Sequence, residues 1–172
     1  MGNQRGVTLV ELVVVVALAA IVLLVVIGNS MPWMAKQTMR SAVHDVHTFL
    51  QLTRIEAVSR NRPVRFVVDT AGGEFQILDS LGTSSLADDL ELHRGRLPET
   101  VGFDRPDSGG VVTLQAIDAV HFQTVFDSDG TVTSGAGDLF FHGSGSYGRI
   151  GVHLAGGTEI SRWNGAEWQA GS

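Results

Sequence analysis

The chain has 172 residues, enough for one compact domain with an appended segment. It contains no cysteine, which excludes a disulfide framework and a thiolate metal site. Its formal net charge of −6 disfavours a nucleic-acid-binding protein, because such proteins present a concentrated basic face.

The N-terminal part combines a short polar start with a long apolar run. Gly6 is followed by the string Val7-Thr8-Leu9-Val10-Glu11-Leu12, and residues 12–35 carry no charge. As a helix, residues 7–33 extend about 40 Å at 1.5 Å per residue. That length exceeds the roughly 30 Å hydrocarbon core of a bilayer, so we expect residues 7–33 to form a membrane-spanning helix.

Glu11 is an acid at the edge of this apolar run. A charge in lipid costs roughly 2.5–3.5 kcal/mol at a helix centre and less near the edge. A plain membrane anchor explains the length of the run but not this acid. A secretory signal peptide needs a shorter apolar region and a small-residue cleavage site, for which residues 28–30 are a weak match.

The string that begins at Gly6 resembles the class III signal of type IV prepilins and type II secretion pseudopilins. The resemblance implies that residues 1–6 are a leader, that prepilin peptidase cuts after Gly6, and that Val7 becomes a methylated N-terminus. Phe is usual in the family where this chain has Val7, and that departure bears on methylation. The resemblance also implies that Glu11, at the fifth mature position, pairs with the N-terminal amine of a neighbouring subunit.

Elementary electrostatics agrees with these implied roles. Cleavage after Gly6 puts a cationic amine on Val7, one helical turn from Glu11. A carboxylate is also favoured near a helix N-terminus. We therefore expect Gly6 and Val7 to be the processing site and Glu11 to be the subunit-docking residue.

The helical pattern continues past a proline. Pro32 removes one backbone hydrogen bond and predicts a kink near residues 28–30. Pro63 disfavours helix at the residue before it, so we expect the helix to end near Asn61. Apolar residues after the kink recur at helical spacing and form a stripe that needs a soluble layer to cover it. They are Ala35, Met39, Ala42, Val43, Val46, Phe49, Leu50 and Ala57.

Short β-branched runs separated by Gly and Asp follow Pro63. We expect strands at residues 64–68, 74–78, 90–93, 111–114, 120–126, 138–141, 149–154 and 158–163, with the last of these being the final strand. The expected fold is α+β. A long kinked N-terminal helix with a membrane-spanning first half packs its second half on one antiparallel sheet layer.

The helix-to-strand junction, residues 50–64, resembles the GspH/FimT type of minor pilins and pseudopilins. The residues that carry this likeness are Leu50, Arg54, Glu56, Ala57, Val58, Arg60, Asn61 and Val64. Looser support comes from residues 126–131, 148–152 and 157–160. The resemblance implies a pilin-like fold with three parts: leader 1–6, transmembrane and filament-core helix 7–33, and amphipathic half-helix plus β-rich domain 34–172.

The same resemblance implies a structural role. The subunit would serve a type II secretion pseudopilus or a type IV pilus, with prepilin peptidase and other pilins as its partners. It would cross the inner membrane once, with the globular domain on the periplasmic side, before entering the filament. Two alternatives stay open. One is a DNA-capturing tip pilin, and the other is a signal-anchored extracytoplasmic domain unrelated to pili.

Several other motifs carry little chemistry. Residues 143–148 match GxGxxG, but a strand is expected after them where a dinucleotide site needs a helix, which favours a flexible loop. Asp127 and Asp129 resemble the start of a calcium loop, yet Asp138 stands where Glu is expected, so a hairpin turn is favoured. The pair His44 and His47 lacks a third ligand. We expect no enzyme activity and no cofactor.

The basic residues do not predict a nucleic-acid partner. After Arg105 only Arg149 and Arg162 are basic. We expect the remaining cluster to be a solvated helix end. That cluster comprises Arg54, Arg60, Arg62 and Arg65.

Overall fold

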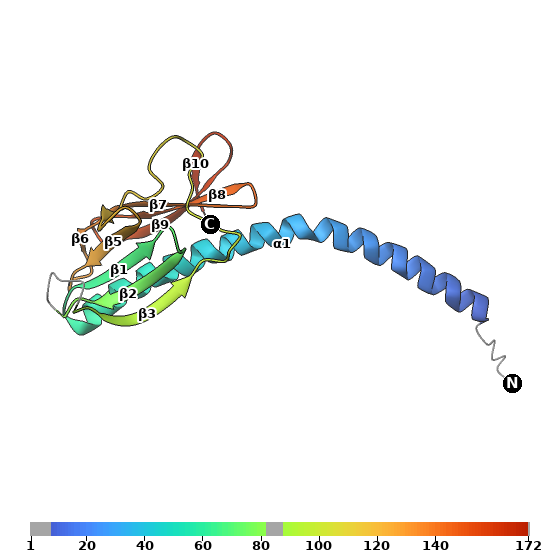
Figure 1. The fold of residues 1–172 in the computed structure, drawn as a ribbon, viewed down its shortest axis with the longest axis horizontal. Coiled ribbons are helices and arrows are strands. Elements are labelled where there is room, and N and C mark those ends of the chain that lie inside the picture. The colour runs from blue at the N-terminus through green and yellow to red at the C-terminus, as the bar shows by residue number, and fades with distance from the viewer. Residues whose placement is uncertain (1–7, 82–87, 172) are drawn as a thin grey trace. The chain divides into compact units, whose positions relative to one another are not determined.

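The computed structural model describes residues 8–81 and 88–171, without the side chains of residues 24–32 and 35. The chain divides into two compact units, Met1–Ala35 and Lys36–Ser172. Figure 1 shows one helix, α1 (Leu9–Arg60), followed by strands. The strands in the described part are β1 (Val64–Asp69), β2 (Glu74–Asp79), β3 (Leu90–Arg96), β4 (Gln115–Ala116), β5 (His121–Phe126), β6 (Val132–Ser134), β7 (Gly137–Gly143), β8 (Ser146–Val152), β9 (Thr158–Trp163) and β10 (Trp168–Ala170).

The first unit is helical from Leu9 onwards, and the backbone remains helical through Pro32. The predicted kink stays a prediction. Among the residues whose side chains the structure describes, which leave out 24–32 and 35, no helical stretch is long and apolar enough to cross a membrane.

The end of α1 is set by local chemistry. Asn61 adopts a left-handed conformation with φ of 52°. Its N–H donates to the carbonyl of Val58, and the N–H of Arg62 donates to the carbonyl of Ala57 at 3.2 Å. These two bonds form a Schellman motif, which satisfies carbonyls that the helix would otherwise leave unpaired. The prediction that the helix ends near Asn61 is confirmed.

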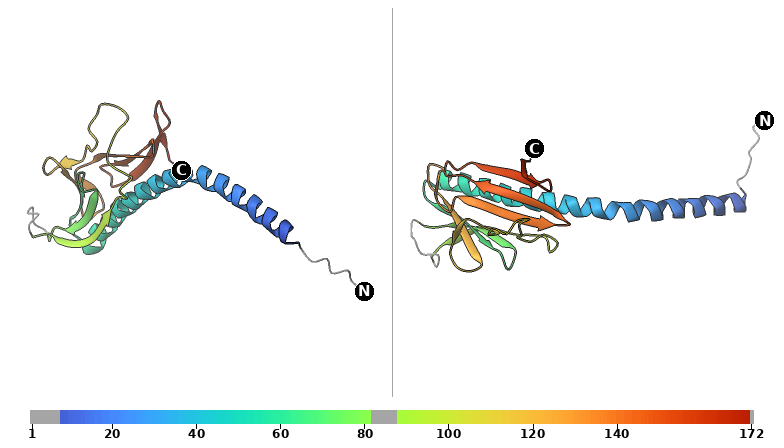
Figure 2. Two further views of the ribbon diagram at one scale, coloured as in Figure 1. Left: turned by 45° about the vertical axis from the view of Figure 1, so that its right-hand side comes forward. Right: turned by 90° about the horizontal axis from the view of Figure 1, so that it is seen from above.

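The second unit contains two antiparallel sheets where one was expected. The first has the order β3-β2-β1-β5-β4, with β6 paired to β5, and the second has the order β10-β9-β8-β7. Figure 2 shows the two sheets from two further sides. The predicted strands 64–68 and 74–78 correspond to β1 and β2, which pair as a hairpin in the register Asp69 opposite Glu74.

The errors in the strand predictions all concern short segments. Residues 111–114 form only an isolated bridge, from Val112 to Leu139. The two- and three-residue strands β4, β6 and β10 were missed, so β9 is not the last strand of the described chain. Segments of two or three residues are too short to show an alternating pattern, and the neighbouring strand determines whether they pair.

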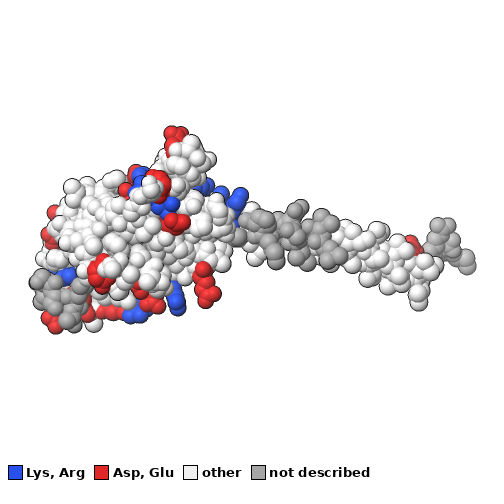
Figure 3. All heavy atoms as spheres, turned by 45° about the horizontal axis from the view of Figure 1, so that its top comes forward, with Lys and Arg blue, Asp and Glu red and all other residues white. Residues whose placement is uncertain are grey.

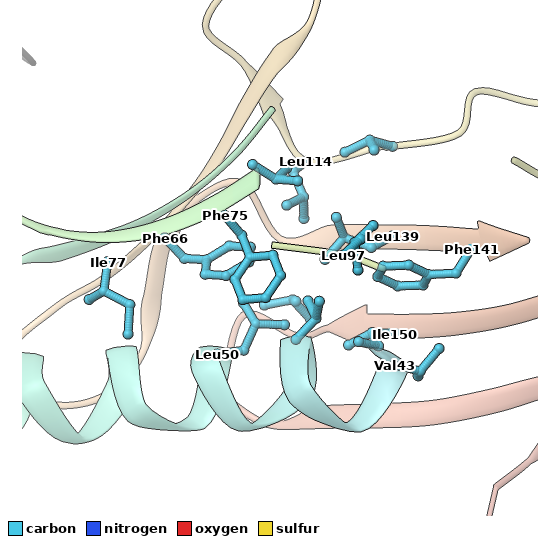
Figure 4. Packing of buried hydrophobic residues seen from close by; sticks show 14 of the residues in the cluster. Val43, Leu50, Phe66, Phe75, Ile77, Leu97, Leu114, Leu139, Phe141 and Ile150 are labelled. Atoms are coloured by element: carbon cyan, nitrogen blue, oxygen red, sulfur yellow. The ribbon is translucent and has the colours of Figure 1, made fainter. Parts of the chain in front are cut away.

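A single hydrophobic cluster joins α1 to both sheets. The predicted stripe is buried at Met39, Ala42, Val43, Val46, Leu50 and Ala57, while the side chain of Ala35 lies outside the described residues. Figure 4 shows Leu50 beside the rings of Phe66 and Phe75. Thr53 is also fully buried. Its hydroxyl donates to the carbonyl of Phe49 at 2.7 Å, so this buried polar group has a partner.

Candidate functional site

The first turn of α1 is capped by the side chain of Thr8. The Thr8 hydroxyl oxygen accepts a hydrogen bond from the backbone N–H of Glu11 at 3.2 Å. The N–H of Leu12 donates to the carbonyl of Thr8, also at 3.2 Å. Thr-x-x-Glu before an apolar run is the sequence signature of this cap, and the sequence interpretation did not use it. Glu11 therefore occupies the N3 position of the helix.

The carboxylate of Glu11 is exposed. Within the described part of the chain, ion pairs to Glu11 from Lys, Arg or His are absent. Gly6 and Val7 lie outside the described residues, so their processing and the pairing of Glu11 with an amine stay predictions. The cap explains why the backbone begins its helix here, but it makes no use of the negative charge.

Apolar side chains around Glu11 point outward in all directions. From residue 9 to residue 23 every described large apolar side chain is at least half exposed, from Val14 at 50% to Leu9 at 81%. We call residues 9–23 the apolar half-helix. A helix that is apolar all round is normally buried in lipid or among other helices. The apolar half-helix is therefore the candidate docking element.

A buried carboxylate holds the other end of α1. Asp79 is fully buried on strand β2 and forms ion pairs with Arg60 at 3.2 Å and with Arg62. Glu56 also accepts from Arg60 at 2.7 Å, and this bond raises the pKa of the Arg60 guanidinium. The helix end is thereby tied to the first sheet.

The predicted solvated basic cluster at this end is confirmed only in part: Arg54 and Arg60 are exposed, whereas Arg62 is half-buried and Arg65 is buried. Arg60 and Arg62 are held by Asp79, and the mostly buried Arg65 lies 3.3 Å from a carboxylate oxygen of Asp89. Burial raises the pKa of Asp89 even though Arg65 acts in the opposite sense. Guanidinium groups that already face carboxylates are poorly placed to bind phosphates of a nucleic acid.

The two histidines on α1 do not converge on one point. His47 is half-buried, and its Nε2 lies 2.9 Å from the Thr158 hydroxyl, whereas His44 is exposed. Burial lowers the pKa of His47. Among residues 8–81 and 88–171, groups of three His, Asp or Glu placed to hold a metal ion are absent.

The carboxylates of the turn at Asp127 accept hydrogen bonds from residues one or two positions away in the sequence. A carboxylate oxygen of Asp129 accepts from the N–H and the hydroxyl of Thr131, at 2.8 and 2.7 Å. Asp127 accepts from the N–H of Ser128 at 2.7 Å. Asp138 instead faces Arg149 on the second sheet, at 3.9 Å.

The GxGxxG string connects two strands, so the predicted loop is confirmed, while its flexibility stays a prediction. β7 ends at Gly143 and β8 starts at Ser146, so only Ser144 and Gly145 form the connection. Their φ angles of 53° and 70° are those of a type I′ turn, which matches the twist of paired strands. A strand follows the turn, as expected, whereas a dinucleotide-binding motif has a helix in that place.

Comparison with known families gives two matches. The family model described as "Type II transport protein GspH" matches residues 42–157. The model described as "Prokaryotic N-terminal methylation motif" matches residues 1–27. Curated proteins show no significant match.

Comparison with solved structures also gives two matches. The type IV minor pilin FimU of Pseudomonas aeruginosa, strain PAO1, has 20% sequence identity and a TM-score of 0.51. The match covers 80% of this chain and 96% of FimU, and it shows a common fold. The minor pseudopilin EpsH from the type 2 secretion system of Vibrio cholerae has 15% identity and a TM-score of 0.49, covering 73% of this chain and 94% of EpsH.

Proposed function

The chain belongs to the GspH family of minor pilins and pseudopilins, and from this premise we propose that it is a filament subunit that docks through its N-terminal helix. The filament is a type II secretion pseudopilus or a type IV pilus. The observation that carries the proposal is the apolar half-helix, which exposes apolar side chains on all sides around one unpaired carboxylate, Glu11. The role is structural and not enzymatic.

Processing at Gly6 is the first step of the proposal. Prepilin peptidase cuts after Gly6, and Val7 becomes the N-terminal residue with a methylated amine. The match of residues 1–27 to the N-terminal methylation motif supports this step. Residues 1–6 are then a leader that is absent from the mature subunit.

Membrane anchoring before assembly is the second step. The run of residues 12–35 carries no charge, and residues 7–33 are long enough as a helix to cross a bilayer. Before assembly the apolar half-helix lies in the inner membrane, with residues 34–172 on the periplasmic side. In the filament, the helices of other subunits replace the lipid around it.

Docking at Glu11 is the third step. An uncompensated carboxylate in lipid is costly, and the amine of an adjacent subunit removes that cost by pairing with it. The pairing therefore favours the assembled state over the free membrane-anchored subunit. It also sets the axial position at which one helix docks against the next.

The substitution Glu11→Gln tests this docking. Gln keeps the capping-box residue type at N3 and removes only the charge. We expect processing after Gly6 to continue and incorporation into filaments to fall at least tenfold, equivalent to about 1.4 kcal/mol. Filaments sheared from cells are quantified against the membrane pool by immunoblot.

The matched control is Thr8→Ala, which weakens the helix cap and keeps the charge. It should lower incorporation less than Glu11→Gln does. Normal incorporation of Glu11→Gln, or an equal loss in both variants, would contradict a docking role for the charge.

The processing site has its own test. N-terminal sequencing of the mature protein should give a start at Val7. A start at Met1 or near Met31 would contradict cleavage by prepilin peptidase and favour a plain anchor or a secretory signal.

A further inference from the structure

A hollow lies in the second unit between α1 and the adjoining parts of strands β8 and β9. Its apolar floor includes Met39 and Val43 from α1, and Tyr147 and Ile160 from the sheet. Gly148 allows the helix to approach the sheet here, because a Cβ at this position would lie 3.0 Å from Val43 and 3.1 Å from Met39. The floor is thus formed by direct packing of helix on strand.

The rim of this hollow is basic. Lys36, Arg40 and His44 line it from α1, Arg162 lines it from β9, and no Asp or Glu is among its lining residues. His44, Lys36, Arg40 and Arg162 are all exposed. Figure 3 shows Lys and Arg atoms gathered beside the part of the helix that follows the grey segment.

The rim concentrates cations for which the described residues supply no acidic partner. Within the described chain, ion pairs occupy Arg60, Arg62, Arg65, Arg94, Arg105 and Arg149. The Lys and Arg outside these pairs are Lys36, Arg40, Arg54, Arg96 and Arg162. Three of these five surround one hollow in a chain whose net charge is −6. Such a rim attracts an anionic group.

The size of the hollow limits what it can take. Its volume is 60 Å³, well below the roughly 300–1,000 Å³ of sites that enclose small molecules. The hollow therefore accepts one group of phosphate size and not a whole cofactor.

The position of the rim in the chain indicates the source of that group. Lys36 is the first charged residue after the uncharged run 12–35. Where that run crosses a bilayer, Lys36 and Arg40 lie at the depth of the lipid headgroups. A basic rim over an apolar floor matches a phospholipid, which places a phosphate beside hydrocarbon.

We propose that this hollow binds the phosphate group of an anionic phospholipid. Arg40 and Arg162 approach the phosphate from the helix and from β9, and the apolar floor accepts the adjoining glycerol and first methylene groups. The site deepens the proposed function and rests on its membrane-anchoring step. It gives the anchored subunit a fixed contact with the bilayer surface that assembly into a filament must break.

The single tyrosine of the chain provides a direct probe, because Tyr147 lines the hollow. The full chain is labelled with 3-fluorotyrosine, held in micelles of an uncharged detergent, and followed by its one ¹⁹F signal. Dihexanoyl phosphatidylglycerol should shift that signal saturably, and dihexanoyl phosphatidylcholine should do so much more weakly. Absence of a saturable shift with phosphatidylglycerol, or equal shifts with both lipids, overturns the proposal.

Charge-matched variants test the basic rim. Lys36→Gln with Arg40→Gln should weaken phosphatidylglycerol binding about 25-fold, at about fivefold for each basic side chain near an anionic surface. Arg54→Gln with Arg96→Gln removes the same charge from two other unpaired residues and should leave binding within twofold. Arg162→Gln should cost about fivefold, since the site needs both elements. An equal loss in the two double variants overturns the proposal in favour of a general charge effect.

Two further titrations separate other ligands from the lipid. If inorganic phosphate saturates the same signal at the same concentration as phosphatidylglycerol, the ligand of the hollow is a free anion and the lipid proposal is overturned. If a hexaglutamate peptide binds more tightly than phosphatidylglycerol, the ligand of the hollow is an acidic protein segment and the lipid proposal is overturned. Resistance of the chain to alkaline carbonate extraction from membranes tests the anchoring step separately. A missing ¹⁹F shift in an anchored protein rejects only the lipid site.

Discussion

The two halves of α1 treat their apolar side chains in opposite ways. Leu18 in the apolar half-helix is 58% exposed, whereas Leu50 on the same helix is fully buried. The difference lies in their surroundings, because the core cluster of both sheets includes residues of α1 only from Met39 onwards. The second half completes a soluble domain within the chain. The first half needs other molecules to cover it.

The largest expected effect comes from truncating the buried half. Leu50→Ala leaves a cavity beside Phe66 and Phe75 in the core (Figure 4). We expect the free energy of unfolding to fall by about 2–5 kcal/mol. Urea unfolding of the full chain in uncharged detergent, followed by near-ultraviolet circular dichroism, measures it.

Leu18→Ala is the matched substitution in the exposed half. It should leave the domain's unfolding midpoint unchanged, because the domain core contains no residue of that segment. A comparable loss of stability in both variants would break the comparison, since it would mean that the first half also stabilises the domain.

A smaller effect is expected at the end of the buried half. Asp79→Asn keeps the size of the side chain but removes the charge that holds Arg60 and Arg62. Hydrogen bonds to charged groups contribute about 1.5–3 kcal/mol, so we expect a loss of stability in this range. Glu91→Gln, at the exposed pair with Arg94, is the control and should not change the unfolding midpoint. Equal midpoints for Asp79→Asn and the unmodified chain would show that the clamp does not stabilise the helix end.

The smallest expected effect is a pH dependence from His47. Burial lowers its pKa in the folded state, so the unfolded chain binds a proton more readily. The free energy of unfolding keeps its full value above the unfolded-state pKa of His47, about 6.5, and declines as the pH falls below that value. Thermal unfolding from pH 7.5 to 5 should show this slope, and His47→Gln should flatten it. His44→Gln should reduce the slope less than His47→Gln does, because burial lowers the pKa of His47 more than the charge of His44 does. A slope that survives in His47→Gln would assign the titration to another group.

Local patterns allowed much of the architecture to be predicted. The helix end at Asn61 follows from Pro63 and a residue that tolerates a left-handed conformation, both within a few positions of the boundary. The buried stripe from Met39 to Ala57 follows from helical spacing, and the β1–β2 hairpin follows from alternation around a Gly-containing turn. The class III signal around Gly6 and Glu11 is contiguous, so it is readable without any fold.

The tertiary structure decided the features that depend on residues distant in sequence. The longer strands divide into two sheets, and the short strands β6 and β10 pair with β5 in the first sheet and with β9 in the second. The charge of the buried Arg65 is faced by Asp89, which is distant in sequence. The cost of burying the Asp79 carboxylate is offset by two arginines, which precede it by 17 and 19 residues. The basic hollow combines Lys36 with Arg162, which no sequence period connects.

The sequence by itself determined the helix, its apolar run and apolar stripe, the prepilin-like signal and the alternation within the longer strands. Each of these patterns is formed by residues close together in the sequence. Only the tertiary structure decided which charges are neutralised and which remain free. Ion pairing requires approach to within about 4 Å, and that approach is set by how the helix packs on the sheets. Glu11 and the rim of Lys36, Arg40 and Arg162 are among the charges that the ion pairs of the described residues leave without a partner, and they are the ones to which we assign docking and lipid binding.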